Sequence, residues 1–391
     1  MGDQTGISWT ESTWNPWMGC TRVSPGCDGC YMFREQRQYG NDPELVRRSK
    51  TKFDAPLKWE EPKLVFTCSW SDWFHVNADD WRDEAWDIIR RSPQHTFQIL
   101  TKRPGRIHHC LPADWGDGYP NVWLGVSVES AAFVSRVDVL RGIPAALRFI
   151  SAEPLLGSLF PSGLPLAGQP AAADVPRESV DGGMQSAAPS DAGSIPASST
   201  QDSRPLDRSG SAESTAADDA TGGAEASRRL RTLDLSGFGW IIVGGESGPR
   251  KQGATDIPAA RPMHPDWARE IRDYVLYGEA RRPAHMGAGL MIDPSPVILG
   301  EGRSVALHMK QWGSWTPDPF GASSENVRWV GVDGSVYTTE NLDVYGIEDN
   351  ALRLTRMRYA GPHPSDGGKL LDGVEWCEIP ERALPGQLTL A

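Results

Sequence analysis

The sequence lacks any apolar run long enough to cross a membrane, and its first residues lack the basic and apolar regions of a secretory signal peptide. Position 6 carries no serine or threonine after Gly2, which argues against a myristoyl anchor. Positive charge is also scarce, since 39 Lys and Arg residues stand against 51 Asp and Glu residues. The formal net charge of −12 argues against a protein that coats nucleic acid through charge alone, but it is compatible with a local basic groove. We expect a cytoplasmic protein.

Cysteine is sparse as well, with 6 residues in 391, yet three of them lie close together as Cys20, Cys27 and Cys30. A cytosolic chain does not normally keep disulfides, so clustered thiols indicate a metal or redox site. Three thiolates in one short loop can bind three irons of a [4Fe–4S] cluster, which leaves the fourth iron open. The amino and carboxylate groups of S-adenosylmethionine (SAM) can chelate that iron. One electron from the cluster then cleaves a carbon–sulfur bond of SAM and yields a radical that abstracts hydrogen.

The same spacing is also compatible with a structural zinc site, in which a histidine or Cys68 is the fourth ligand. Zinc sites usually consist of two close cysteine pairs, and no second Cys-x-x-Cys follows here, which slightly favours the cluster. Cys68 lies at an expected strand end and is more typical of a core residue. We interpret His264 and His308 as structural, and Cys110 and Cys377 as isolated thiols.

Apolar runs alternate with amphipathic segments along much of the chain. Strands are expected at residues 64–68, 96–100, 122–128, 147–150, 240–243 and 306–309, and helices at residues 81–91, 131–140 and 265–277. This alternation indicates a parallel sheet with right-handed crossovers. The sequence therefore predicts an α/β fold with a partial (β/α)6 barrel that is open rather than closed.

Three segments depart from this pattern. Residues 161–232 are dominated by Ala, Ser, Gly, Asp and Pro, and we expect a disordered insertion there because they cannot bury enough apolar surface. A shorter insertion is expected at residues 278–303, and a small β-rich appendage at residues 327–391. The cluster-binding segment and the first half of the barrel then occupy residues 1–160, and the second half occupies residues 233–326.

Polar residues follow the expected strands, which is where parallel barrels build their active sites. The candidates for catalysis are Glu129, Glu153 and Lys310; those for cofactor binding are Ser127, Gly244, Gly245 and Glu246; and those for substrate binding are Asp72, Lys102, Arg103 and Trp312. Glycines after a strand let a ligand approach the backbone closely. Lys102 and Arg103 can meet a phosphate, and Trp70, Trp73 or Trp312 can stack on an extruded base.

Distinctive short segments follow one another along the chain. They include Thr-Trp-Asn-Pro at 13–16, Ser-Asp-Trp-Phe-His at 71–75, Leu-Thr-Lys-Arg-Pro at 100–104, Ser-Ala-Glu-Pro-Leu at 151–155, Gly-Gly-Glu-Ser-Gly at 244–248 and Lys-Gln-Trp-Gly at 310–313. Together with the cysteine loop, these segments resemble the phage Gp37/Gp68 proteins, also called the DUF5131 family, which are related to the radical-SAM superfamily. The resemblance covers nearly the whole chain outside the two insertions.

The resemblance implies a radical-SAM type of partial barrel with the cluster near its top, and a SAM-contacting glycine turn at residues 244–246. Six residues separate Cys20 from Cys27, whereas the usual radical-SAM motif has three at that point. The long insertion at residues 161–232 is not typical of the family.

From the resemblance we expect a phage-encoded radical-SAM enzyme in the host cytoplasm, with a [4Fe–4S] cluster and SAM as cofactors and flavodoxin or ferredoxin as the reducing partner. The expected substrate is phage DNA that carries a hypermodified base, and the expected reaction is isomerisation of an amino-acid-substituted 5-methyl group of thymine. One alternative is a non-enzymatic, zinc-stabilised phage protein that binds nucleic acid or a partner. The other is radical-SAM repair or methylation of nucleic acid.

Overall fold

The structure is a computed structural model that describes residues 5–160, 232–249, 259–277, 305–318, 326–339, 341–342 and 354–380. These residues belong to one compact unit, formed by Met1–Leu164 and Leu230–Ala391. A second unit, Pro165–Arg229, lies outside the described residues. The two expected insertions likewise lie outside them, apart from residue 232.

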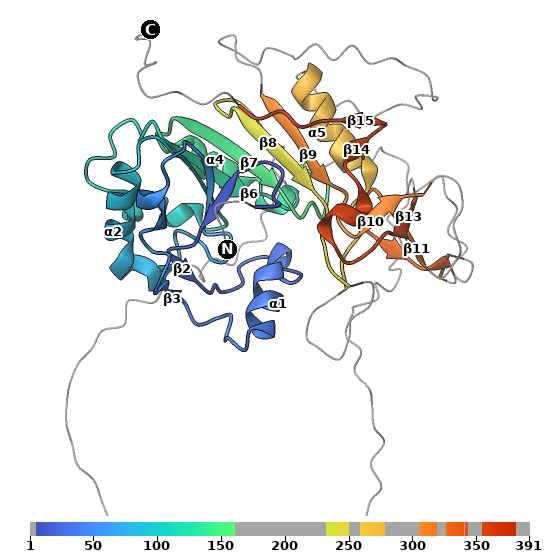
Figure 1. Cartoon of the computed structure of the whole chain (residues 1–391). Coiled ribbons are helices and arrows are strands. Elements are labelled where there is room, and N and C mark those ends of the chain that lie inside the picture. The colour runs from blue at the N-terminus through green and yellow to red at the C-terminus, as the bar shows by residue number, and fades with distance from the viewer. Residues whose placement is uncertain are drawn as a thin grey trace, which may run out of the picture. The chain divides into compact units, whose positions relative to one another are not determined.

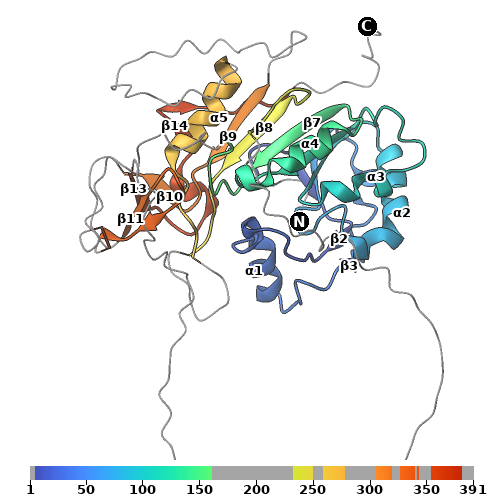
Figure 2. The ribbon, with the colours of Figure 1, turned by 180° about the vertical axis from the view of Figure 1, so that it is seen from behind.

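The core of the fold is one curled sheet of seven parallel strands (Figures 1 and 2). In spatial order the strands are β1 (Ser12–Trp14), β4 (Leu64–Thr67), β5 (Thr96–Thr101), β6 (Val122–Ser127), β7 (Leu147–Ala152), β8 (Trp240–Gly244) and β9 (Ala306–Gln311). Each neighbouring pair runs parallel, so all seven carboxyl ends lie at the same edge of the sheet. The sheet is a half-barrel.

Both faces of the sheet are buried, as parallel sheets require. Successive residues of a strand point to opposite faces, so each strand contributes to two separate cores. One face joins strand residues such as Val65 and Ile150 to apolar residues of α2 (Asp79–Arg90), α4 (Ser135–Arg141) and α5 (Pro265–Tyr277). The opposite face holds a second cluster made by Trp9, Leu64, Phe66, Trp123, Phe149, Trp240 and Ile242.

The six expected strands are all present, each within two residues of its expected bounds. The helices at 79–90 and 265–277 are also where the apolar spacing placed them. The expected helix at 131–140 is a 3₁₀ turn, Ala131–Phe133, followed by α4. The number of strands was wrong, because β1 adds a seventh at the edge beside β4.

Shorter elements surround the half-barrel. They are β2 (Trp17–Met18), β3 (Arg47–Arg48), α1 (Tyr31–Gln38) and α3 (Ile107–Cys110), with β2 and β3 forming an antiparallel pair. Among the described residues, no helix is long and apolar enough to cross a membrane.

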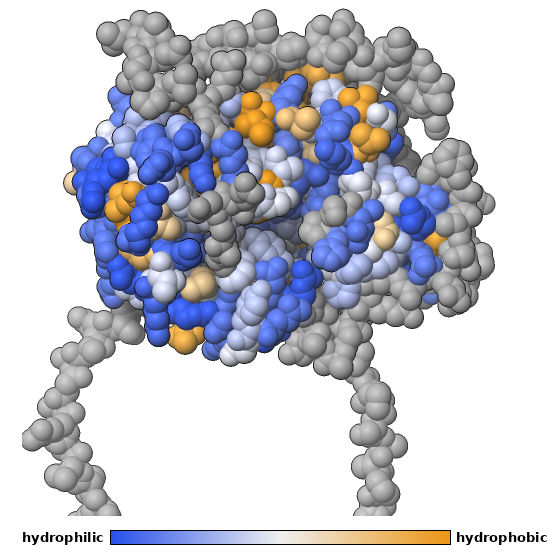
Figure 3. All heavy atoms as spheres, viewed as in Figure 1, coloured by the Kyte–Doolittle hydropathy of each residue, from blue (hydrophilic) through white to orange (hydrophobic). Residues whose placement is uncertain are grey.

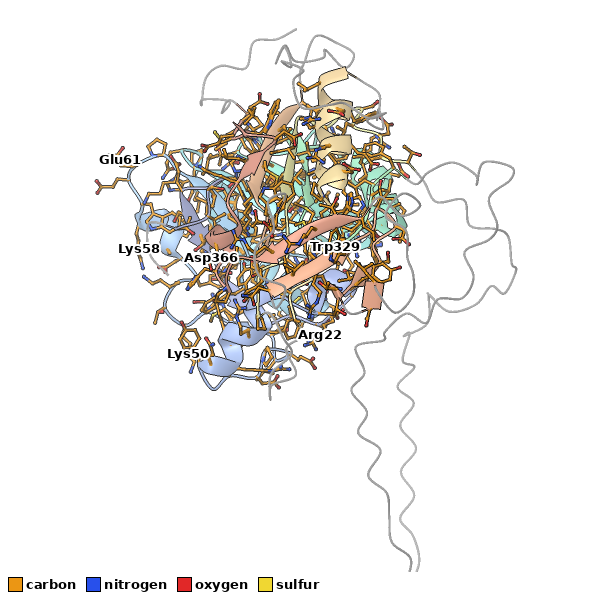
Figure 4. The ribbon with its side chains drawn as sticks, turned by 90° about the vertical axis from the view of Figure 1, so that its right-hand side faces the viewer. Arg22, Lys50, Lys58, Glu61, Trp329 and Asp366 are labelled. Carbon is orange, nitrogen blue, oxygen red and sulfur yellow. The ribbon has the colours of Figure 1, made fainter. Side chains whose placement is uncertain are left out.

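The C-terminal region forms a four-stranded antiparallel sheet in the order β10 (Trp315–Pro317), β13 (Thr355–Tyr359), β11 (Val327–Val330) and β12 (Val336–Tyr337). Figure 4 views the molecule from the side of this sheet and labels Trp329 of β11. A hairpin of β14 (Leu370–Leu371) and β15 (Val374–Glu375) follows. Strands thus occupy the region of the expected appendage, but β10 precedes residue 327 and pairs with β13, so this sheet crosses the expected boundary.

Candidate functional site

A cavity of about 1730 Å³ lies at the carboxyl edge of the sheet. Its walls come from the cysteine loop, from α1 and from the ends of the strands and the segments that follow them. The lining residues at and after the strand ends are Cys68, Ser69, Trp70, Ser71, Asp72, Thr101, Lys102, Arg103, Ser127, Ser151, Glu153, Gly245, Glu246, Ser247, Lys310 and Gln311. In Figure 3 a recess lies between α1 below and the strands above, bordered mostly by hydrophilic residues. The structure therefore gathers most of the candidate residues around one space.

The three clustered cysteines all line this cavity as free thiols. Cys27 ends the 3₁₀ helix η1 (Pro25–Cys27) and is 7% exposed, while Cys30 directly precedes α1. Cys68 lines the cavity too, as a buried free thiol at the end of β4. Within the described ranges, no group of three or more His, Cys, Asp and Glu side chains is placed to hold a single metal ion.

Burial controls the protonation of two of these thiols. It raises the pKa of Cys20 to about 12, with a further contribution from the Asp72 carboxylate and opposition from the Arg103 guanidinium. Burial also raises the pKa of Cys30, which the Lys102 ammonium opposes. Both thiols are therefore protonated at neutral pH in the metal-free chain. Because metals bind thiolates, any metal group bound by these sulfurs would have to displace these protons.

Two glycines let the cysteine loop lie directly on two buried carboxylates. A Cβ atom at Gly26 would lie 2.6 Å from Oε1 of Glu129, and a Cβ atom at Gly29 would lie 2.5 Å from Oε1 of Glu246. Ser24 adds a hydrogen bond of 2.6 Å from its hydroxyl to Oε1 of Glu129. The loop is thus fitted to the ends of β6 and β8 at positions where no larger residue has room.

Glu129 is fully buried and its carboxylate is occupied by protein partners. Lys102 Nζ lies 3.1 Å from Oε1, and Arg136 Nη1 lies 2.8 Å from Oε2. Burial alone would raise the pKa of Glu129, but these two cations outweigh it and hold the pKa below its usual value. Glu129 does not line the cavity. The contacts of Glu129 are those of an anchor for the cysteine loop, and its catalytic role stays a prediction.

Arg103 connects Cys20 to the end of β5 (Thr96–Thr101) through one guanidinium. Its Nη1 donates to Cys20 Sγ at 3.5 Å and to Asp72 Oδ2 at 3.1 Å. Its Nη2 donates to the Thr21 carbonyl at 2.8 Å and to the Thr21 hydroxyl at 2.9 Å. The donors of Arg103 are directed at the cysteine loop and at Asp72, and its substrate-binding role stays a prediction.

Asp72 and Lys102 are also engaged within the protein. Asp72 is 5% exposed and accepts hydrogen bonds from the Thr101 hydroxyl, the Phe74 amide and the Lys102 amide, besides that from Arg103. The Lys102 ammonium pairs with Glu129. Both residues line the cavity as predicted, but they shape its wall rather than present a free charge to a ligand.

Glu246 forms the third anchored group, at the end of β8. Arg261 holds both of its oxygens, with 2.6 Å from Nη2 to Oε1 and 2.9 Å from Nε to Oε2. The same Nη2 donates to the Pro25 carbonyl at 2.7 Å, so Arg261 joins Glu246 to the cysteine loop.

The two glycines before Glu246 differ in their surroundings. The Gly244 carbonyl accepts from the Leu155 amide at 2.9 Å, and Gly244 does not line the cavity. Gly245 lines it, and a Cβ atom there would lie 2.0 Å from the Trp312 carbonyl oxygen. The turn is therefore tight because β8 and β9 meet at it, and the cofactor contact at Gly244 stays a prediction.

Of the remaining predicted site residues, Glu153, Lys310 and Ser127 also line the cavity. Lys310 Nζ lies 2.5 Å from Glu153 Oε1, and each side chain is 20% exposed. Ser127 and Ser151 are directly paired across β6 and β7, so their side chains lie next to each other on the cavity floor. A cation, a carboxylate and two hydroxyls can hold a polar ligand and transfer a proton.

The tryptophans expected to stack on a base differ in placement. Trp312 is 4% exposed, donates from its indole to the Leu370 carbonyl and does not line the cavity. Trp73 is fully buried, with its ring centroid 4.9 Å from those of Trp17 and Trp86. Trp312 and Trp73 thus pack in the core, and Trp70 is the one of the three that lines the cavity. Base stacking by these residues stays a prediction.

The model of one protein family, DUF5131 (protein of unknown function), matches residues 4–280 of the chain. The chain belongs to the DUF5131 family. No curated protein and no solved structure matches it. The resemblance stated from the motifs is thereby confirmed at the level of the DUF5131 family.

The DUF5131 match contains the cysteine loop and six of the seven strands of the half-barrel. The seventh strand, β9, and the C-terminal sheet lie after the matched residues. Sequence reasoning gave no role to Ser24, Arg136 and Arg261, and it noted Ser151 only as a polar residue after an expected strand. The arginines carried no local signal, because their partners lie far away in the sequence or inside the fold. Ser24 stands within the cysteine loop itself, and its position between two cysteines is the one signal that was available.

Proposed function

We propose that this DUF5131 protein is a radical-SAM enzyme of the phage Gp37/Gp68 type that holds a [4Fe–4S] cluster on Cys20, Cys27 and Cys30. The observation that carries the proposal is the placement of three free thiols from one short loop on a single wall of a large cavity at the carboxyl edge of a parallel half-barrel. Parallel barrels build their active sites at that edge.

The donor set fits such a group, because three thiols are available and the loop that carries them is rigidly held. When bound, the cluster supplies the electron that cleaves SAM and generates a 5′-deoxyadenosyl radical. Around it, Arg103 holds Cys20, while Lys102, Arg136 and Arg261 neutralise the buried carboxylates beneath the loop. Glu153 and Lys310 remain as the pair that can bind a polar group or hold a proton in the cavity.

The rival proposal is a non-enzymatic, zinc-stabilised protein that binds nucleic acid or a partner. Zinc binds its thiolates at about 2.3 Å, so its ligands must converge on one point. In a cluster each thiolate binds a different iron, so the thiols stand farther apart. Metal content separates the two proposals. A further enzymatic alternative, repair or methylation of nucleic acid, is distinguished by transfer of a methyl group from SAM.

Replacement of Cys27 by alanine is expected to abolish both cluster binding and SAM cleavage. The protein is purified without oxygen and reconstituted with iron and sulfide, and the EPR spectrum of the reduced form is recorded with and without SAM. Wild type should show a [4Fe–4S]⁺ signal that changes when SAM is added. Cys27→Ala should lack the signal and should release no 5′-deoxyadenosine in the presence of a reductant.

Cys110→Ala is the matched control, because Cys110 is a buried free thiol that does not line the cavity. This variant should behave as wild type. Stoichiometric zinc in wild type without SAM cleavage, or an unchanged EPR signal in Cys27→Ala, contradicts the proposal.

For the substrate, we propose a base in phage DNA, with isomerisation of an amino-acid-substituted thymine as the reaction and flavodoxin or ferredoxin as the electron donor. Because Lys102 and Arg103 are engaged, the cations that support this proposal are Arg34 and Arg37 of α1. Both line the cavity, and neither forms an ion pair within the part of the chain that the structure describes. They stand three residues apart on one face of the helix, with Trp70 also lining the cavity. A cation pair beside an aromatic ring suits a phosphate and a stacked base.

Replacement of both Arg34 and Arg37 by glutamine is expected to weaken binding of single-stranded DNA. Each lost phosphate contact should reduce the slope of log affinity against log salt by about 0.7. Fluorescence anisotropy with a labelled oligonucleotide at several salt concentrations measures both effects. The control is Arg90→Gln with Arg91→Gln, which removes the same charge from two exposed positions where α2 ends. Equal salt slopes for the two double variants would refute the assignment of α1 as the DNA-binding face.

A further inference from the structure

Arg103 lies two residues after the end of β5, at a sharp turn of the backbone. Pro104 follows it and begins a 3₁₀ helix, Pro104–Arg106, so the chain turns sharply after Arg103. The Arg103 side chain is 12% exposed and lines the cavity beside Cys20. An arginine in this setting is permanently charged and partly removed from water, so its field acts strongly on its neighbours.

The guanidinium is fixed in place by Asp72. That carboxylate is itself held by the Thr101 hydroxyl at 2.8 Å and the Phe74 amide at 2.9 Å on Oδ1, and by the Lys102 amide at 3.1 Å on Oδ2. Arg103 therefore meets a rigid partner on one side and Thr21 on the other. The same guanidinium also donates from Nη1 to Cys20 Sγ, at 3.5 Å.

A donor that points at a ligating sulfur changes the energy of the group which that sulfur binds. Reduction adds a negative charge to a cluster, and an N–H···S hydrogen bond or a nearby positive charge stabilises the reduced form. A nearby carboxylate has the opposite effect. Charges of both signs lie near Cys20: the Arg103 guanidinium contacts its sulfur, and the Asp72 carboxylate pairs with that guanidinium.

The geometry points to Arg103 as the residue that positions Cys20 and raises the reduction potential of the cluster, with Asp72 as its opposing charge. This inference rests on the proposed function, since it concerns the cluster that Cys20 binds. It replaces the phosphate contact expected for Arg103 with a role in electron transfer. Arg103 is a positioning residue here, because it acts through the Cys20 thiolate.

The test is a redox titration of the reconstituted protein, followed by the EPR signal of the reduced cluster. Arg103→Gln should shift the potential to a more negative value by about 59 mV, which corresponds to a tenfold loss in the equilibrium constant of a one-electron reduction. Asp72→Asn should shift it in the opposite direction. The double variant should lie between the two single variants, since it removes one charge of each sign.

Arg106→Gln is a matched control, because Arg106 donates to a different cysteine, Cys110, at 3.6 Å outside the cavity. Its potential should equal that of wild type. A loaded Arg103→Gln variant with an unchanged potential overturns the inference, whereas a wild-type protein without a cluster overturns the proposed function instead. If Arg103→Gln folds but retains no iron, Asp72→Asn decides the matter: a more positive potential supports the inference, and an unchanged one overturns it.

Discussion

Replacement of Glu129 by alanine is expected to lower the free energy of unfolding by about 3 to 5 kcal/mol, as in other proteins where one partner of a buried ion pair is removed. The side chain is fully buried between Lys102 and Arg136, whose side chains are 18% and 10% exposed. Without the carboxylate, two cations share a poorly solvated region and the Ser24 hydroxyl loses its acceptor. Urea denaturation followed by circular dichroism measures the loss.

Glu44→Ala provides the comparison for this variant. Glu44 also pairs with an arginine, Arg22, but the two side chains are 55% and 35% exposed. Such a surface pair contributes at most about 1 kcal/mol. Similar losses for Glu129→Ala and Glu44→Ala would show that the buried network is not a stabilising unit.

The same carboxylate contributes to the pH dependence of stability. Its pKa in the folded chain lies below the ordinary value of 4.5, so the unfolded chain binds a proton more readily. The stabilisation is therefore complete above the unfolded-state pKa and is lost as pH falls through the folded-state pKa. In Glu129→Gln this part of the acid destabilisation should be missing.

Replacement of Gly245 by alanine is expected to destabilise the fold by about 3 kcal/mol or more, which is at the upper end for overpacking. The added Cβ would lie 2.0 Å from the Trp312 carbonyl oxygen and 2.5 Å from its carbonyl carbon. Because both atoms belong to the backbone, no rotamer change relieves the contact. The Gly245 amide also donates to the Gln311 carbonyl at 3.0 Å, so β8 and β9 cannot separate without losing that bond.

Gly105→Ala separates this steric effect from the general effect of replacing glycine. A Cβ atom at Gly105 meets nothing within 4 Å, and its φ is not positive, so alanine should be tolerated there. The midpoints of urea denaturation of the two variants should differ clearly. A Gly245→Ala protein as stable as wild type would mean that the strand ends are looser than their geometry indicates.

Much of the half-barrel could be predicted from the sequence because its strands are continuous apolar runs. Residues 122–127 and 240–244 are buried at every position, as strands covered on both faces must be. β1 was missed because Ser12 and Thr13 break any apolar pattern, and its pairing with β4 is a tertiary contact. The close spacing of Cys20, Cys27 and Cys30 in the sequence likewise placed them near one another in the fold, where all three line the cavity.

The partners of the polar residues could not be predicted in the same way. Nothing near Arg103 in the sequence indicates that its guanidinium binds the Thr21 carbonyl. Likewise, nothing near Glu246 indicates that its carboxylate pairs with Arg261 and not with a ligand. A charged residue at a strand end has the same sequence signature whether it faces a substrate or a buried counter-charge. The partner of Trp312 could not be predicted either. Its indole lies in the core and donates a hydrogen bond to the distant Leu370 carbonyl.

The contact of Gly26 and Gly29 with Glu129 and Glu246 has a consequence for biosynthesis. The ribosome completes the cysteine loop when it has made thirty residues, but the side chains that support the loop follow at residues 129, 246 and 261. A nascent chain therefore exposes its thiols long before the surface beneath them exists. The contacts that hold the loop in its final shape can therefore form only after residue 261 has been translated, when six of the seven strands of the half-barrel have been made.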